Sequence, residues 1–534
     1  MNNLLNTITL REKVGQLFFP AAFVNDTEAN YIEIENLIKN CGVGGLTFFH
    51  SRLSAATNYE GKNNSVANDN SAALLKALIV RYQRVSKIPL LISIDAEWGL
   101  AMRIEKTPQY PYAITLGALP DNENKLLFEV GKHIGFDLKQ LGIHYNLAPV
   151  ADVNDNPKNP VIGYRSFGDD KYNVTQKTLS FSAGLRNAGI LSCLKHFPGH
   201  GNTEVDSHLG LPVIKKTISE LQEQELFPFK EAIRNNEVDS IMIGHLAVPA
   251  LTDGKILSAT LSSQIIQNLL RLELGYQGLI ISDALNMHSV SKLYPEKGLL
   301  EWKAFEAGND ALCFSENVAE GIEKIMALAT TYRIDESWNR ILNLKTNCKL
   351  FDAIDLVHPD EKIVFDFKAV ARLNFEIATK VITITKNELQ LLPIDKTTKN
   401  AVLSIYNSKD AVFCSKLKAS INADFIEILN DDTVDHAKIM NHIDSFDKVI
   451  IALFVPSVKP INNFEIDFAI LNLLEELFKN SKVILCLFGN PIALSVLPGH
   501  KKIKTIVHCY QQFDTFQEVA ANVLQQLDGT NRAT

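Results

Sequence analysis

The 534-residue sequence has no apolar stretch long enough to cross a bilayer and no run rich in lysine or arginine. A membrane-spanning helix needs about 20 consecutive apolar residues, and nucleic-acid binding requires a basic surface. The net charge is instead −8. The first residues, Met-Asn-Asn-Leu-Leu, lack the basic and apolar regions of a signal peptide. We therefore expect no membrane segment and no nucleic-acid partner. As the sequence stands we expect a cytoplasmic protein, or a periplasmic or secreted one if a leader was removed.

Cysteine is also scarce, with seven residues scattered along the chain. Their spacing matches neither a disulfide framework nor paired zinc ligands. Most lie in apolar runs, as Cys486 does within VILCLF, so buried free thiols are expected. Apolar residues make up 46% of the chain and charged residues 21%, which is typical of a globular protein. The length predicts two or three domains.

Eight short apolar runs, separated by amphipathic segments, occupy the first part of the chain. They are residues 16–21, 43–49, 90–94, 143–150, 190–194, 240–244, 279–281 and 310–314. Continuous apolar runs are typical of parallel strands that are buried on both faces. Eight such units fit a (β/α)8 barrel better than an open sheet. Thr9 and Glu12 form a capping-box pattern, which predicts that a helix begins there.

A second set of strand-like runs follows a polar, proline-containing segment. The runs are residues 381–385, 401–405, 449–455, 483–488 and 506–509, with a helical stretch at 464–479. Alternating strands and helices indicate a further α/β layer domain. We therefore predict a barrel domain over residues 1–354, a linker over 355–364 and a C-terminal α/β sandwich domain over 365–534.

Ionisable residues follow five of the predicted barrel strands, where functional groups of such barrels lie. They are Asp95, Asp152, the pair Lys195 and His196, His245, and Asp283. A lone carboxylate after a buried strand is costly unless it is paired, so Asp283 is either a nucleophile or base facing a substrate, or a structural strand-end cap.

The segment from Lys195 to His208 carries five ionisable or metal-competent side chains. Asp206 lies two residues before His208 and can orient its imidazole for acid/base work, or the two can simply order the loop. His196, His200 and His208 could also be considered as metal ligands. Their spacing, interrupted by Pro198 and Gly199, places them on no common helical face and no thiol completes a set, so we expect neither a metal nor another cofactor.

Two arginines and one tryptophan complete the candidates. Arg103 and Arg165 can each clamp a hydroxyl or carboxylate, or form a structural ion pair. Trp98 is either a stacking platform for a sugar or a packing residue.

Together these strings resemble the family 3 glycoside hydrolases, and within them the β-N-acetylglucosaminidase branch. Residues 269–273 (LLRLE) followed by 278–283 (GLIISD) are similar to the family signature around the nucleophile. Residues 195–201 (KHFPGHG) followed by 206–208 (DSH) resemble the mark of the acetylglucosaminidase branch. The resemblance covers the whole predicted barrel.

The resemblance implies a retaining exo-glycosidase that releases terminal β-linked N-acetylglucosamine from a carbohydrate such as a cell-wall muropeptide or a chitin-type oligosaccharide. Asp283 would be the nucleophile, with His208 as acid/base and Asp206 as its partner. The expected substrate-binding residues are Asp95, Arg103, Arg165, Lys195, His196 and His245.

One departure from the family and three alternatives accompany this prediction. Residues 95–99 read DAEWG where the family usually has DQEGG, which affects the outer side of the pocket. A phosphorylase on the same scaffold is one alternative, because a neutral histidine would admit anionic phosphate. A β-glucosidase or β-xylosidase is another, and a carbohydrate-binding protein without turnover is the third.

Overall fold

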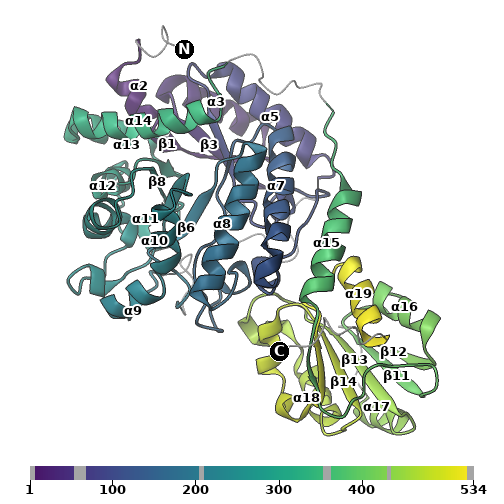
Figure 1. Ribbon diagram of the computed structural model, residues 1–534. Helices are drawn as coiled ribbons and strands as arrows, with labels where there is room; N and C mark the ends of the chain where they lie inside the picture. Colours follow the sequence, from purple (N-terminus) through teal and green to yellow (C-terminus); the bar gives the residue numbers. More distant parts are fainter. Residues whose placement is uncertain (1–6, 53–67, 204–209, 353–361, 430–434, 526–534) are drawn as a thin grey trace. The chain divides into compact units, whose positions relative to one another are not determined.

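The computed structural model describes residues 7–52, 68–203, 210–352, 362–429 and 435–525. These residues form two compact units (Figure 1). Unit 1 comprises Met1–Ala113 and Asn124–Phe367, and unit 2 comprises Ile114–Glu123 and Lys368–Thr534. Most of the predicted linker lies outside the described residues.

The strands of unit 1 are all parallel to their neighbours. β1 (Phe18–Phe19) pairs with β9 (Leu312–Cys313). One sheet has the order β2 (Ala21–Phe23), β3 (Gly45–Phe49), β4 (Leu91–Ile94) and β5 (Tyr145–Asn146), and another the order β6 (Cys193–Phe197), β7 (Ser240–Ile243) and β8 (Leu279–Ser282). Isolated parallel bridges join Tyr145 to Leu191, Val150 to Lys195, and Ile281 to Ala311. The segments of β5 and β6, and those of β8 and β9, are thereby neighbours as well.

Helices alternate with these strands. They are α2 (Leu10–Gly15), α3 (Glu28–Cys41), α5 (Ser71–Val85), α7 (Asn124–Gln140), α8 (Lys171–Ala188), α9 (Ile218–Glu223), α10 (Phe227–Arg234), α11 (His288–Ser291), α12 (Leu299–Ala307), α13 (Val318–Leu328), α14 (Thr331–Asn347) and a π-helical segment, Gln264–Glu273. The predicted capping box at the start of α2 is confirmed, because Thr9 and Glu12 each accept the other's backbone N–H.

Strand β6 corrects one predicted boundary. It runs from Cys193 to Phe197 rather than over residues 190–194, because Ile190 still closes the turn after α8 by donating its N–H to Leu185 O at 3.0 Å. Lys195 and His196 therefore lie within the strand. Both are buried, and both find partners for their polar atoms inside the unit, so the strand can contain them.

Unit 2 contains a six-stranded sheet in the order β10-β15-β14-β13-β11-β12, in which β10 is antiparallel to β15 and the other pairs are parallel. The strands are β10 (Thr383–Asn387), β11 (Asn400–Ile405), β12 (Ala423–Ile428), β13 (Lys448–Phe454), β14 (Val483–Phe488) and β15 (Thr505–His508). The helices are α6 (Ala113–Gly117), which starts at the last residue of unit 1, α15 (Phe367–Val381), α16 (Val412–Ser420), α17 (His436–Ile443), α18 (Phe468–Leu477) and α19 (Asp514–Gln525).

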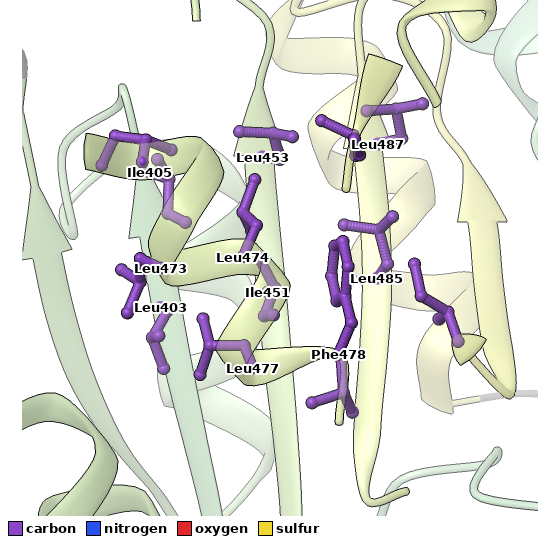
Figure 2. Packing of buried hydrophobic residues seen from close by; sticks show 14 of the residues in the cluster. Leu403, Ile405, Ile451, Leu453, Leu473, Leu474, Leu477, Phe478, Leu485 and Leu487 are labelled. Atoms are coloured by element: carbon purple, nitrogen blue, oxygen red, sulfur yellow. The ribbon is translucent and has the colours of Figure 1, made fainter. Parts of the chain in front are cut away.

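One face of this sheet is covered by α18. Figure 2 shows Leu473, Leu474 and Leu477 of the helix against leucine and isoleucine side chains of β11, β13 and β14. The helix is shorter than the predicted stretch 464–479. It begins at Phe468 because residues 462–465 have left-handed φ angles between 49° and 59°.

The cysteines and the helices can be compared with what the sequence predicted. All seven cysteines are free, six of them buried and Cys348 half-buried, as expected for thiols in apolar runs. Among the described residues, no helix combines the length and apolar content that a bilayer crossing requires.

Candidate active site

The ammonium group of Lys195, in β6, lies between two carboxylates that follow β4. Its Nζ is 2.9 Å from Asp95 Oδ1 and 2.7 Å from Glu97 Oε1. The Lys195 side chain is 2% exposed. Since an unpaired charge at this depth would be strongly disfavoured, the two carboxylates fix the lysine in its charged form.

Two arginines extend this cluster at either end. Arg103 Nη2 donates to Asp95 Oδ2 at 2.9 Å, and Arg165 forms a two-pronged bond with Glu97 through Nε at 2.9 Å and Nη2 at 2.7 Å. Burial alone would raise the pKa of Asp95, but Lys195 and Arg103 hold it well below the ordinary value. The pKa of Glu97 is lowered against burial in the same way by Arg165 and Lys195. The cluster therefore presents ionised hydrogen-bonding groups in fixed positions.

The histidine after Lys195 is held by the carboxylate that follows β5. Asp152 Oδ2 is 2.8 Å from His196 Nδ1, and Asp152 Oδ1 accepts the backbone N–H groups of His196 and His200 at 3.1 and 2.8 Å. Because Asp152 accepts a hydrogen bond from Nδ1–H, the other ring nitrogen of His196 can face a ligand. His200 bonds to Thr203 Oγ1 through Nδ1 at 2.8 Å, and burial lowers its pKa to about 4.

Asp283 follows β8 directly and is half-buried. Its Oδ1 accepts the N–H of Ala284 at 2.8 Å. Burial alone would raise the pKa of this carboxyl, but the nearby imidazoles of His245 and His196 bring it below the ordinary value. Asp283 is thus held as a carboxylate, the form in which it can act as a nucleophile.

His245, at the end of β7, uses both ring nitrogens within the unit. Nε2 donates to the carbonyl oxygen of Ala284 at 2.9 Å, and Nδ1 is 2.7 Å from Thr260 Oγ1. The ring therefore lies beside the nucleophile candidate, since Ala284 is the neighbour of Asp283. The predicted contact between His245 and a substrate stays a prediction.

Asp206 and His208, the predicted acid/base pair, lie outside the described residues. Among the described residues, the structure brings together Lys195, His196, Asp95, Arg103 and Arg165 as one connected region of unit 1. Asp283 lies near enough to His196 and His245 for both imidazoles to lower its pKa.

Trp98 is a packing residue in this structure. Its side chain is buried, and its ring lies 5.0 Å from the ring of Tyr112 and 5.9 Å from that of Tyr164. The larger side chain in the DAEWG segment thus fills space next to the loop that carries Arg165. Ala96 is buried too, and its backbone N–H and C=O bond to Asn146.

Glu97 belongs to the cluster, and Asp152 holds His196 beside it. Neither was assigned a role in the site from the sequence, although Asp152 was noted at a strand end. Glu97 lies two residues beyond Asp95, after the end of β4, and both carboxylates reach Lys195. That short spacing was the available signal. Asp152 stands after a predicted strand like the other candidates. Its task, holding His196 and His200, depends on a loop contact that sequence spacing does not show.

Buried carboxylates and cations that meet at the carboxyl ends of parallel strands are the arrangement in which α/β enzymes of this architecture place their active sites. The chain belongs to glycosyl hydrolase family 3, since the profile of the family's N-terminal domain matches residues 9–344. The predicted resemblance to this family is confirmed.

Several relatives carry the name β-hexosaminidase or β-N-acetylglucosaminidase. The chain is 37% identical over 291 residues to β-hexosaminidase A of Pseudoalteromonas piscicida, covering 52% of this chain and 46% of that protein. It is 27% identical to the β-N-acetylglucosaminidase/β-glucosidase of Cellulomonas fimi, covering 72% and 66%. The chain thus spans about half to two thirds of the length of these relatives.

Solved structures extend the likeness to both units. A family 3 β-N-acetylglucosaminidase from Paenibacillus sp. str. FPU-7 matches over 97% of each chain, with 29% identity and a TM-score of 0.76. A β-glucoside phosphorylase with 21% identity and a TM-score of 0.79 shares the fold.

Proposed function

We propose that this protein is a retaining exo-β-N-acetylglucosaminidase that works by double displacement. The carboxylate of Asp283 attacks the anomeric carbon while His208 protonates the leaving oxygen, which gives a glycosyl-enzyme. Water then attacks the anomeric carbon and displaces the carboxylate of Asp283 while His208 removes the proton of the water, and Asp206 stabilises the imidazolium each time it forms. Family membership and the relatives named β-hexosaminidase support this assignment.

The observation that carries the proposal is that Asp283 is held in its ionised form near a polar cluster whose side chains are fixed by ion pairs. A half-buried carboxyl is kept ionised by neighbouring imidazoles and one backbone N–H, and Lys195 is locked between two carboxylates nearby. A nucleophile must be ionised before the substrate arrives, and hydroxyl recognition needs donors and acceptors that do not reorganise. The contacts of Lys195 and the lowered pKa of Asp283 support the proposal on both counts.

We assign recognition of the sugar to Asp95, Arg103, Arg165, Lys195, His196 and His245, and add Glu97. Carboxylates accept from sugar hydroxyls, while the lysine and arginines donate to them. A histidine acid suits this set because its neutral form does not repel the carboxylate of Asp283 before the proton is transferred.

We further propose that the parallel strands of unit 1 close into a (β/α)8 barrel. The pairing of β1 with β9, together with the bridges that link β5 to β6 and β8 to β9, supports closure. In this proposal residues 1–354, apart from the segment Ile114–Glu123 that groups with unit 2, form the catalytic barrel, 355–364 the linker and 365–534 the sandwich domain. The substrate we propose is a muropeptide fragment of the cell wall or a chitin-type oligosaccharide, as in peptidoglycan recycling.

The test is a panel of aryl β-glycosides followed by proton NMR, with and without inorganic phosphate. We expect N-acetylglucosamine to be released with retained configuration, at the same rate in both conditions. Formation of a sugar phosphate would identify a phosphorylase instead, preference for an aryl glucoside or xyloside would identify a glucosidase or xylosidase, and binding without turnover a carbohydrate-binding protein.

Two variants test the assigned roles. Asp283→Ala should lower kcat by orders of magnitude, because nothing replaces the covalent step. His208→Ala should slow substrates with poor leaving groups far more than activated aryl glycosides, since only the former need a proton on the leaving oxygen. Full activity of Asp283→Ala would remove it as the nucleophile, and equal effects of His208→Ala on both substrates would remove His208 as the acid.

A further inference from the structure

Asn159 connects two loops that the proposed mechanism needs in a fixed relation. It lies in the loop after β5, and its side chain is fully buried. Its Nδ2 donates to the carbonyl oxygens of His200 and Gly201 at 2.9 and 3.0 Å and reaches Thr203 Oγ1 at 3.3 Å. Three acceptors of one short segment after β6 thus converge on a single amide group.

The other end of the same side chain holds the loop that carries Arg165. Asn159 Oδ1 accepts the N–H groups of Val161 and Ile162, each at 2.9 Å. Arg165 in turn donates through Nη1 to Val161 O at 3.2 Å and through its backbone N–H to Ile162 O at 2.7 Å. One amide therefore fixes the backbone on which Arg165 rests.

Further contacts fix the segment after β6 as far as Thr203. A Cβ on Gly201 would lie 1.7 Å from Val153 O, so only glycine permits this approach to the loop after β5. Asn156 Nδ2 donates to Thr203 O at 3.3 Å, and Asn202 Nδ2 to Asp155 Oδ1 at 2.8 Å. Thr203 is the last described residue before the stretch that contains Asp206 and His208, so its position sets where that stretch begins.

We propose that Asn159 is a positioning residue that couples the start of the acid/base segment, at Thr203, to the loop of Arg165. The inference rests on the proposed function, in which His208 protonates the leaving group. The donor group of Asn159, Nδ2, bonds the segment that leads from His200 to Thr203, and its acceptor atom, Oδ1, bonds the loop of Arg165. Because these two halves of the amide are different atoms, substitutions can separate them.

Asn159→Asp keeps the acceptor bonds to Val161 and Ile162 but sets a carboxylate against two carbonyl oxygens. We expect kcat/KM for a substrate with a poor leaving group, such as the phenyl β-N-acetylglucosaminide, to fall about 10-fold or more. The 2,4-dinitrophenyl substrate, whose leaving group needs no proton, should change less than about 3-fold. Asn159→Ala removes both halves and should in addition raise KM for both substrates through Arg165.

Two further variants keep the test decisive. Thr203→Val removes only the hydroxyl that Asn159 and His200 share, and it should shift the ratio of the two substrates in the same direction by a smaller factor. Asn400→Asp is the matched control, since Asn400 is a fully buried amide of unit 2 that also donates to two carbonyl oxygens, at 2.9 and 3.0 Å. It should lower the melting temperature without changing the substrate ratio.

The outcomes distinguish failure of the positioning role of Asn159 from failure of the proposed function. Wild-type turnover with a substrate ratio unchanged in Asn159→Asp and Thr203→Val overturns the positioning role alone. An equal fall for both substrates also overturns it, because that is what a merely structural residue would produce. No release of N-acetylglucosamine by the wild-type chain overturns the proposed function, and the inference with it.

Discussion

Lys195 is the residue on which the charge arrangement of the candidate site depends. The cluster holds the cations of Lys195, Arg103 and Arg165 against two carboxylates, so its net charge is positive. Without the lysine, Asp95 and Glu97 would each keep one arginine and would lose the cation they share. Each of the two lost bonds joined a buried ammonium to a buried carboxylate, and a buried charged acceptor that loses a donor stays desolvated, which costs about 1 to 3 kcal/mol.

Lys195→Met should therefore lower the free energy of unfolding by about 2 to 6 kcal/mol, as measured by urea titration. The control is Lys303→Met, because Lys303 forms an exposed pair with Glu306 on α12 that contributes within about 0.5 kcal/mol. A loss at Lys195 no greater than the loss at Lys303 would contradict the importance of the buried cluster.

Asp137 predicts a pH dependence of stability that is separate from the site. It lies on α7, accepts the hydroxyl of the fully buried Tyr110 at 2.9 Å, and burial raises its pKa to about 7. The folded state thus binds a proton that the unfolded state, with a pKa of about 4, releases. The stabilisation is complete below pH 4 and is lost as the pH rises to 7.

Asp137→Asn removes this titration, since the amide cannot ionise. The unfolding free energy of the variant relative to the wild type should rise between pH 4 and pH 7 by about 2 kcal/mol or more, and stay constant above pH 7. Urea titrations of both proteins at pH 4.5, 6 and 8 measure this difference. A difference that is the same at all three values would show that Asp137 is ionised in the folded protein.

At the residue scale, the sequence predicted side chains that follow strands directly better than those held by loops. Lys195 and Asp283 stand next to long apolar runs, so their position was evident. Asn159 lies in a polar loop, and the role proposed for it depends on hydrogen bonds to carbonyl groups more than 40 positions away in the chain. Such tertiary contacts have no periodicity that a sequence pattern could reveal.

At the scale of elements, the packing of α7 against α8 depends on glycine. The two helices lie side by side in Figure 1. A Cβ on Gly184 of α8 would lie 2.1 Å from Phe128 O of α7, and one on Gly131 of α7 would lie 2.2 Å from Phe181 O of α8. Each glycine thus faces the backbone of the opposite helix, and backbone cannot move aside as a flexible side chain does.

Gly184→Ala should therefore destabilise the protein by about 1 to 3 kcal/mol, although alanine in a helix normally stabilises by about 1 kcal/mol relative to glycine. Asn187→Ala, at an exposed position of the same helix, is the control and should be neutral or slightly stabilising. Thermal unfolding of both variants decides the sign. Stabilisation by Gly184→Ala would show that the helices can separate without cost.

The elements themselves were predicted where burial on both faces gave continuous apolar runs. β13 and β14 are of this kind and were found within one or two residues of their observed ends. β12 was missed because it is an edge strand with only Ile428 fully buried, and Asp424 and Glu427 interrupt its apolar character. The predicted position of β6 was shifted toward the N-terminus because the charged residues Lys195 and His196 are typical of a loop.

At the scale of the whole molecule, unit 2 is built from two separate parts of the chain. Residues Ile114–Glu123 belong to it together with Lys368–Thr534. Thr115 Oγ1 accepts from Gln511 Nε2 at 2.8 Å, and Lys380 Nζ pairs with Glu123 Oε1 at 2.8 Å. The predicted sandwich domain, residues 365–534, omits this segment, because no composition shift marks it within the first half of the sequence.

A fragment of residues 365–534 should consequently be less stable than the same residues within the whole chain, since it lacks the partners of Gln511 and Lys380. A synthetic peptide of residues 112–124 should restore part of the loss and raise the melting temperature of the fragment. A buried hydrogen bond contributes about 1 kcal/mol, which corresponds to about 2 to 4 °C in a domain of this size. Burial of Leu116 and Leu119, which are 1% and 2% exposed, would add to the shift.

The same peptide with Thr115→Val should give a smaller increase, because it cannot accept from Gln511. If the unmodified peptide leaves the melting temperature unchanged, the segment is not part of what holds unit 2 together, and the sandwich domain is complete without it.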